Sequence, residues 1–173
     1  MATSASRSGM PAARGRSLVV GIVLLGLVAA ATGIAYQRLQ TRRCLDFYGS
    51  EVARLVAAAP HVELLTLAPG AGPGRLVATA ARDVTHAKGL VHLRRGLVED
   101  ANFAWAQPAG AERLPDDAWD LAFVFSDPKV PAARATLVID LDEQTGSVAV
   151  LGKPGRVGLG RIGRGLAKWV DGL

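Results

Sequence analysis

The longest uncharged stretch of the chain is LVVGIVLLGLVAAATGIAY, nineteen residues from Leu18 to Tyr36. At 1.5 Å per helical residue, this stretch is about as long as the hydrocarbon core of a bilayer is thick. Its polar members are Thr32, whose hydroxyl can bond back to its own helix, and Tyr36, which suits an interface. Arginines flank both ends. The pattern therefore predicts a transmembrane helix over residues 18–36 that contacts the lipid bilayer.

A cleaved signal peptide is the competing interpretation of this segment. It has an arginine-rich start, an apolar middle and a small-residue run, Ala29 to Ala31. However, the apolar stretch continues to Ile34 and is stopped by QRLQTRR, which favours a retained signal-anchor. Three arginines lie before the span and three follow it, so with the α-amine the balance favours the C-terminal part on the non-cytoplasmic side. Small-residue pairs in the span leave a homodimer open.

The positive charge of the chain is concentrated at its N-terminus. Of the 20 Lys and Arg residues, six lie within residues 1–43, a stretch that has none of the 15 acidic residues. The remaining residues are therefore close to neutral. A nucleic-acid binder needs its positive charge on the folded surface that meets phosphate, so no nucleic-acid partner is expected. Residues 1–17 are small, polar and basic, which predicts a disordered tail.

The single cysteine, Cys44, excludes an intramolecular disulfide and a cysteine-rich zinc site. We interpret it as a small apolar residue just beyond the anchor. Lipidation or an interchain disulfide near the bilayer are the alternatives.

Beyond the anchor, the periodicity predicts an α+β fold. A juxtamembrane helix is expected over residues 37–60, because apolar residues recur at helical spacing until Pro60. Residues 61–173 form one compact domain with a mainly antiparallel sheet of about five strands, covered by about three helices. The strands are expected at 61–67, 75–81, 119–125, 135–141 and 147–152. An amphipathic helix is expected over 85–103 with Thr85 as its N-cap, and another over 161–173.

The stretch VIDLDEQTG, residues 138–146, looks the most like a catalytic motif. Its Asp-x-Asp after an apolar strand resembles the start of the haloacid dehalogenase-type phosphotransferases. In that family a Thr follows the first Asp by four residues, whereas Thr145 follows Asp140 by five. The spacing also departs from a calcium loop, since Leu151 stands where a bidentate Glu is required. We therefore predict a β-hairpin, with Gly146 at a positive φ.

The other motifs do not assemble into a known kind of site. GLGRIG, residues 158–163, matches the dinucleotide pattern, but the ten residues after Gly163 leave no room for the following strand or for an acidic residue about twenty positions on. His86 and His92 are six residues apart, which does not place two zinc ligands on one helix face; His61 is the third histidine. The acid pairs Glu99–Asp100 and Asp116–Asp117 are explained by solvation. No catalytic residue, metal ligand or cofactor site is assigned.

Arg161, Arg164 and Lys168 form a basic stripe on the last helix, opposite its apolar face. This stripe is a candidate contact for anionic lipid headgroups or an acidic partner, although a solvated helix face explains it as well. The expected function is a non-catalytic binding or accessory module at the membrane, with a protein partner still to be identified. The alternatives are a secreted domain and a membrane-tethered hydrolase-type enzyme. That enzyme would use the loop-borne residues Asp127, Asp140, Asp142 and His92.

Overall fold

The computed structural model describes residues 12–71, 76–105, 119–142 and 146–173, and divides the chain into two units, one up to Leu39 and one from Gln40 to Leu173. The first unit consists of most of helix α1 (Ala12–Tyr48). Every residue from Val19 to Tyr36 is exposed, and Leu25 is 71% exposed. The Thr32 hydroxyl donates to the Val28 carbonyl at 2.8 Å, as the sequence predicted. By length and composition, this helix can act as a membrane span or a signal sequence.

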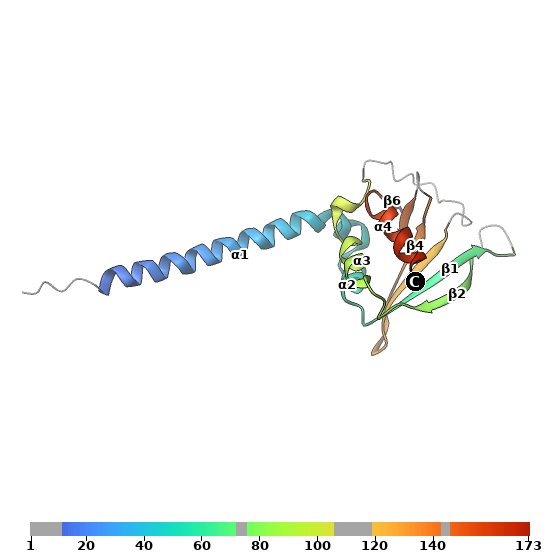
Figure 1. Cartoon of the computed structure of the whole chain (residues 1–173), viewed down its shortest axis with the longest axis horizontal. Coiled ribbons are helices and arrows are strands. Elements are labelled where there is room, and N and C mark those ends of the chain that lie inside the picture. Colours follow the sequence, from blue (N-terminus) through green and yellow to red (C-terminus); the bar gives the residue numbers. More distant parts are fainter. Residues whose placement is uncertain (1–11, 72–75, 106–118, 143–145) are drawn as a thin grey trace, which may run out of the picture. The chain divides into compact units, whose positions relative to one another are not determined.

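The second unit is built on a six-stranded antiparallel sheet with the strand order β2-β1-β3-β4-β5-β6 (Figure 1). The strands are β1 (His61–Pro69), β2 (Leu76–Asp83), β3 (Leu121–Asp127), β4 (Val130–Asp140), β5 (Ser147–Val150) and β6 (Arg156–Gly158). The α+β class and the antiparallel sheet are thus confirmed. The sixth strand was not predicted, because three residues, preceded by Gly155 and ending in Gly158, carry too little periodicity to be recognised.

The helix expected over residues 85–103 is shorter in the structure. Helix α3 covers Leu90–Gly96, and a 3₁₀ turn covers Asp100–Asn102. Thr85 is not its N-cap, which is a correction to the sequence prediction. The Thr85 hydroxyl instead accepts a 3.0 Å hydrogen bond from the Val62 amide, so it continues the pairing with β1 beyond the end of β2. Gly89 occupies the N-cap position with a φ of 88°.

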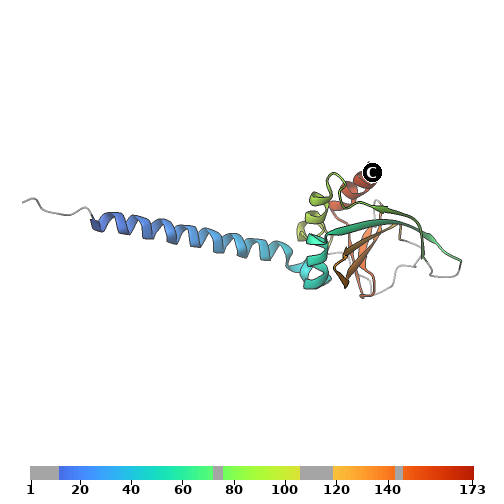
Figure 2. The same cartoon turned by 90° about the horizontal axis from the view of Figure 1, so that it is seen from below.

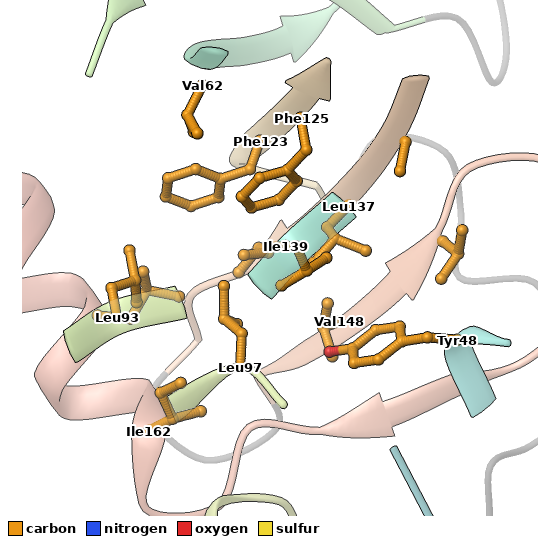
Figure 3. Packing of buried hydrophobic residues seen from close by; sticks show 14 of the residues in the cluster. Tyr48, Val62, Leu93, Leu97, Phe123, Phe125, Leu137, Ile139, Val148 and Ile162 are labelled. Atoms are coloured by element: carbon orange, nitrogen blue, oxygen red, sulfur yellow. The ribbon is translucent and has the colours of Figure 1, made fainter. Parts of the chain in front are cut away.

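The hydrophobic core lies between the sheet and the helices α2 (Ser50–Ala58), α3 and α4 (Ile162–Asp171). In both views α2 and α3 lie side by side next to the sheet (Figure 2). Phe123 and Phe125 stack with ring centroids 6.1 Å apart and face the helices (Figure 3). The other core residues labelled there are Tyr48, Val62, Leu93, Leu97, Leu137, Ile139, Val148 and Ile162.

The helix expected over residues 37–60 is interrupted at Gly49, whose φ of 76° lies in the left-handed region. The Lys153 ammonium donates a hydrogen bond to the Tyr48 carbonyl at this break. Helix α2 then ends at Ala58, just before Pro60. Because Cys44 and Tyr48 are buried in the core, this region is part of the folded unit rather than a separate connector.

Asp100 ties the start of the folded unit to the rest of it. Its carboxylate accepts hydrogen bonds from the backbone N–H groups of Arg43 at 2.9 Å and Cys44 at 2.8 Å. Because Arg43 and Cys44 lie within helix α1, these two hydrogen bonds attach the C-terminal part of this helix to a distant part of the chain. The interpretation of Asp100 as a merely solvated acid is therefore wrong. Cys44 is 1% exposed, which fits its interpretation as a small apolar residue.

Strands β4 and β5 form the predicted antiparallel hairpin, with Asp140 opposite Ser147. Gly146 does not have the positive φ that the sequence predicted, so glycine is needed at this position for a different reason. A β-carbon at this position would lie 2.5 Å from the Asp142 carbonyl oxygen and 3.0 Å from that of Asp140. Glycine is required here because the backbone of the turn passes too close for any side chain.

Candidate functional site

Helix α4 has one buried and one basic face. Ile162 and Leu166 are buried in the core, whereas Arg161, Arg164 and Lys168 are exposed. The amphipathic helix predicted from the sequence is therefore present, and its three cationic side chains reach solvent.

Trp169 fixes α4 against its neighbours. Its ring lies 6.1 Å from that of Phe123, and its Nε1 donates a 2.8 Å hydrogen bond to the Lys88 carbonyl. Lys88 belongs to the loop between β2 and α3. The hydrogen bond therefore holds this loop beside the C-terminal half of α4.

An open pocket of about 550 Å³ lies where this loop, β2 and α4 meet. Three of its lining residues are cationic, namely Arg82, Lys88 and Lys168, and none of the lining side chains is acidic. No salt bridge found among residues 12–71, 76–105, 119–142 and 146–173 involves these three side chains. The remaining lining residues are small or apolar: Ala87, Gly165, Trp169, Gly172 and Leu173.

The local backbone explains how these residues come together. Arg82 pairs with Leu64 across the β1–β2 ladder, so both point to the face of the sheet that carries the helices. Gly89 turns the loop toward α4, and a β-carbon there would lie 3.1 Å from Trp169 Nε1. Gly165 has no heavy atom within 4 Å of its would-be β-carbon, which leaves the surface of α4 open beside Lys168.

Sequence reasoning found one of the three cations of the pocket. Lys168 was selected as part of the basic stripe, but Arg161 and Arg164 do not line the pocket. Arg82 and Lys88 were missed, because each is an ordinary polar residue of its own segment. Residues 82–88 are far from Lys168 in the sequence, so no local pattern indicates that they share a site.

The residues of the alternative enzyme hypothesis are not brought together. Asp127 and Asp140 lie at opposite ends of the β3–β4 ladder. His92 is exposed on α3, which packs against the helix-covered face of the sheet. Asp140 points to the other face, because it alternates with the core residues Leu137 and Ile139. Asp142, two residues after Asp140, is exposed.

Asp140 is the most unusual of these acids, since it is 8% exposed. Burial raises the pKa of its carboxyl group, and the charges of Asp120 and Asp142 add to this rise. A hydrogen bond from the Asp142 amide, at 2.9 Å, opposes it. The hydroxyl of Ser147 on the paired strand is buried and has no hydrogen-bond partner within the part of the chain that the structure describes.

The surroundings of the histidines and of the glycine motif GLGRIG indicate structural roles. His61 contacts the Thr85 hydroxyl at 3.2 Å and lies 3.9 Å from Asp83, while His86 is exposed. Within the described ranges, no group of three or more His, Cys, Asp or Glu side chains is arranged to hold a metal ion. In GLGRIG, a β-carbon on Gly160 would lie 2.8 Å from the Asn102 carbonyl, so this glycine accommodates the protein's own backbone.

The chemistry that the pocket supports best is the binding of anions, because one arginine and two lysines line it together with an aromatic residue. Comparison with protein-family models, with curated proteins and with solved structures found no match to the chain.

Proposed function

We propose that this chain is a single-pass membrane-anchored protein whose unit from Gln40 to Leu173 is a non-catalytic binding module beside the membrane. The observation that carries the proposal is the exposure of the whole apolar surface of the helix between Val19 and Tyr36. Soluble proteins rarely expose continuous apolar patches larger than a few hundred Å². Lipid is the environment that removes this surface from water without a dedicated protein partner.

The binding role is supported by the surface of the folded unit. The basic face of α4 and the cationic pocket share Lys168. Arg161 and Arg164 extend the positive surface beyond the pocket. A partner or a membrane surface that carries negative charge would gain from this arrangement, most strongly at low ionic strength.

Membrane anchoring is tested by alkaline carbonate extraction of membranes that contain the full chain, together with its intact mass. We expect the protein to stay in the membrane pellet with residues 18–36 retained. Replacement of Leu24 and Leu25 by arginine should release it, because two charges in the centre of the span are costly. A mature protein that lacks the residues up to Ala31 would contradict the anchor and favour the secreted alternative.

The binding role and the side of the membrane need separate experiments. Photo-crosslinking from exposed positions of α4, followed by co-purification from native membranes, should trap a partner through the unit from Gln40 to Leu173. Externally added protease should digest this unit in intact cells if it lies on the non-cytoplasmic side. Protection of the unit in intact cells and its digestion in permeabilised cells would reverse the proposed orientation.

A further inference from the structure

We infer that the pocket lined by Arg82, Lys88 and Lys168 binds a ligand that carries a phosphate monoester. This inference rests on the proposed binding function and names the class of ligand that the module takes. The ligand is either a phosphorylated lipid headgroup or a small soluble phosphate ester, since both present the same anionic group.

The charge arrangement is the first support. Three cationic residues from three separate segments, namely β2, the loop that follows it and α4, line one hollow that has no acidic side chain in its lining. Like charges placed together disfavour the folded state unless an anion compensates them. The nearest acid in sequence, Asp83, accepts a 2.8 Å hydrogen bond from the Thr85 amide and lies beside His61.

The mixture of donors points to phosphate. The Arg82 guanidinium offers a planar fork of N–H donors, whereas Lys88 and Lys168 offer point charges that can approach from other directions. A phosphate monoester carries between one and two negative charges at neutral pH, and its three free oxygens can accept donors from several sides. A single carboxylate has one charge and two oxygens, which leaves part of this donor set unused.

The volume of the pocket and the side chain of Trp169 indicate how large the ligand can be. About 550 Å³ is within the range of small-molecule sites and exceeds what a bare phosphate needs. The rest of the volume can take a glycerol-sized or ring-sized group against Trp169, whose ring is held by its hydrogen bond to Lys88. The open mouth of the pocket also permits a headgroup that remains attached to a lipid.

The experiment is isothermal titration of the full chain, in a non-ionic detergent, with three probes. Glycerol 3-phosphate represents the soluble ligand, dihexanoyl phosphatidic acid the anionic headgroup, and dihexanoyl phosphatidylcholine the headgroup without net charge. We expect phosphatidic acid to bind and phosphatidylcholine not to bind. Glycerol 3-phosphate should bind as well if the ligand is soluble, and only the lipid should bind if the acyl chains contribute.

The test variant replaces Arg82, Lys88 and Lys168 by glutamine. A matched control replaces Arg54, Lys129 and Arg134 by glutamine, which changes the net charge equally at exposed positions outside the pocket. Loss of one charge-assisted hydrogen bond costs about tenfold in affinity. Each single substitution in the pocket should therefore weaken binding about tenfold, the triple variant should abolish it, and the control should keep it.

The inference is overturned if neither glycerol 3-phosphate nor phosphatidic acid binds, if phosphatidylcholine binds as well as phosphatidic acid, or if the control loses as much affinity as the triple variant. If circular dichroism shows that the triple variant fails to fold, the three single substitutions test the pocket in its place. Because the titration takes place in detergent, it is independent of the carbonate extraction. Failure of the phosphate pocket is thus distinguishable from failure of the membrane anchor.

Discussion

The hydroxyl group of Tyr48 is buried in the core without a hydrogen-bond partner among the residues that the structure places. Its ring contributes to an aromatic group, with Phe47 at 5.1 Å and Phe103 at 6.5 Å between ring centroids. The ring therefore stabilises the fold, whereas the hydroxyl loses its hydration without compensation.

Replacing Tyr48 by phenylalanine should raise the free energy of unfolding by about 1 kcal/mol, because it removes a buried unsatisfied polar group and keeps the ring. Urea denaturation of the detergent-solubilised chain measures this change. Tyr36→Phe, at an exposed position, is the matched control and should have little effect. A destabilised Tyr48→Phe variant would show that the hydroxyl has a partner after all.

Asp140 provides a pH-dependent prediction. Because burial raises the pKa of its carboxyl group, the folded state keeps the proton at pH values where the unfolded chain has lost it. The stabilising effect of this proton is complete below the unfolded pKa of about 3.9 and is lost as the pH rises through the folded pKa. Asp140→Asn should therefore be more stable than the native chain at pH 7, and this advantage should vanish near pH 3.

Denaturation of the native chain and of Asp140→Asn at the two pH values measures this difference. Asparagine keeps the oxygen that accepts the Asp142 amide, so the turn should stay intact. The exposed Asp171→Asn serves as the control. If Asp140→Asn proved less stable at pH 7, the charge of Asp140 would have to be compensated by a ligand or a neighbouring group.

At the scale of the elements, the connection from β6 to α4 depends on close backbone contact. Gly160 lies against the backbone of residues 102–104, and Ala104 forms a bridge to Gly158. The spacing of three glycines resembles a nucleotide-binding turn in sequence. In the structure, however, the space before α4 at Gly160 is occupied by the protein's own chain.

Gly160→Ala should lower the free energy of unfolding by about 1–3 kcal/mol, because the new methyl group would overlap a carbonyl oxygen that cannot move freely. Gly165→Ala is the control within α4, where space is open, and should be neutral or stabilising by up to about 1 kcal/mol. Thermal melts followed by circular dichroism report both. Equal effects of the two substitutions would contradict the close contact at Gly160.

At the scale of the whole molecule, the core of the second unit includes the end of α1. Cys44, eight residues beyond the apolar stretch, is 1% exposed and is held by the Asp100 carboxylate through its backbone amide. Lipidation or an interchain disulfide at Cys44 would need this segment to leave the core. The thiol is therefore a reporter of how firmly the start of the folded unit is attached.

Labelling of Cys44 by a maleimide should be slow in the folded chain and should become fast in urea, in parallel with the loss of circular dichroism. Asp100→Ala should speed labelling before the rest of the unit unfolds, because it removes two hydrogen bonds from backbone amides to a carboxylate, at a cost of about 1–3 kcal/mol. Asp171→Ala, on the exposed surface of α4, is the control and should leave the rate unchanged. Rapid labelling of the native chain would contradict the burial.

The sequence by itself determined the features that have a local cause. The apolar helix follows from nineteen uncharged residues, the β4–β5 hairpin from strand-forming runs on both sides of a turn, and the two faces of α4 from helical spacing. Helix boundaries were harder to predict from the sequence. Gly49 interrupts one expected helix, and Thr85 bonds to a strand rather than capping another helix.

Only the tertiary structure decided which distant groups meet. Asp100 looks like a solvated acid until the fold brings it to the amides of residues 43 and 44, and Arg82 and Lys88 look like ordinary surface residues until β2 and its loop reach α4. The physical reason is that hydrogen bonds and charges act over a few ångströms in space. Sequence patterns record only what neighbouring residues on one element share.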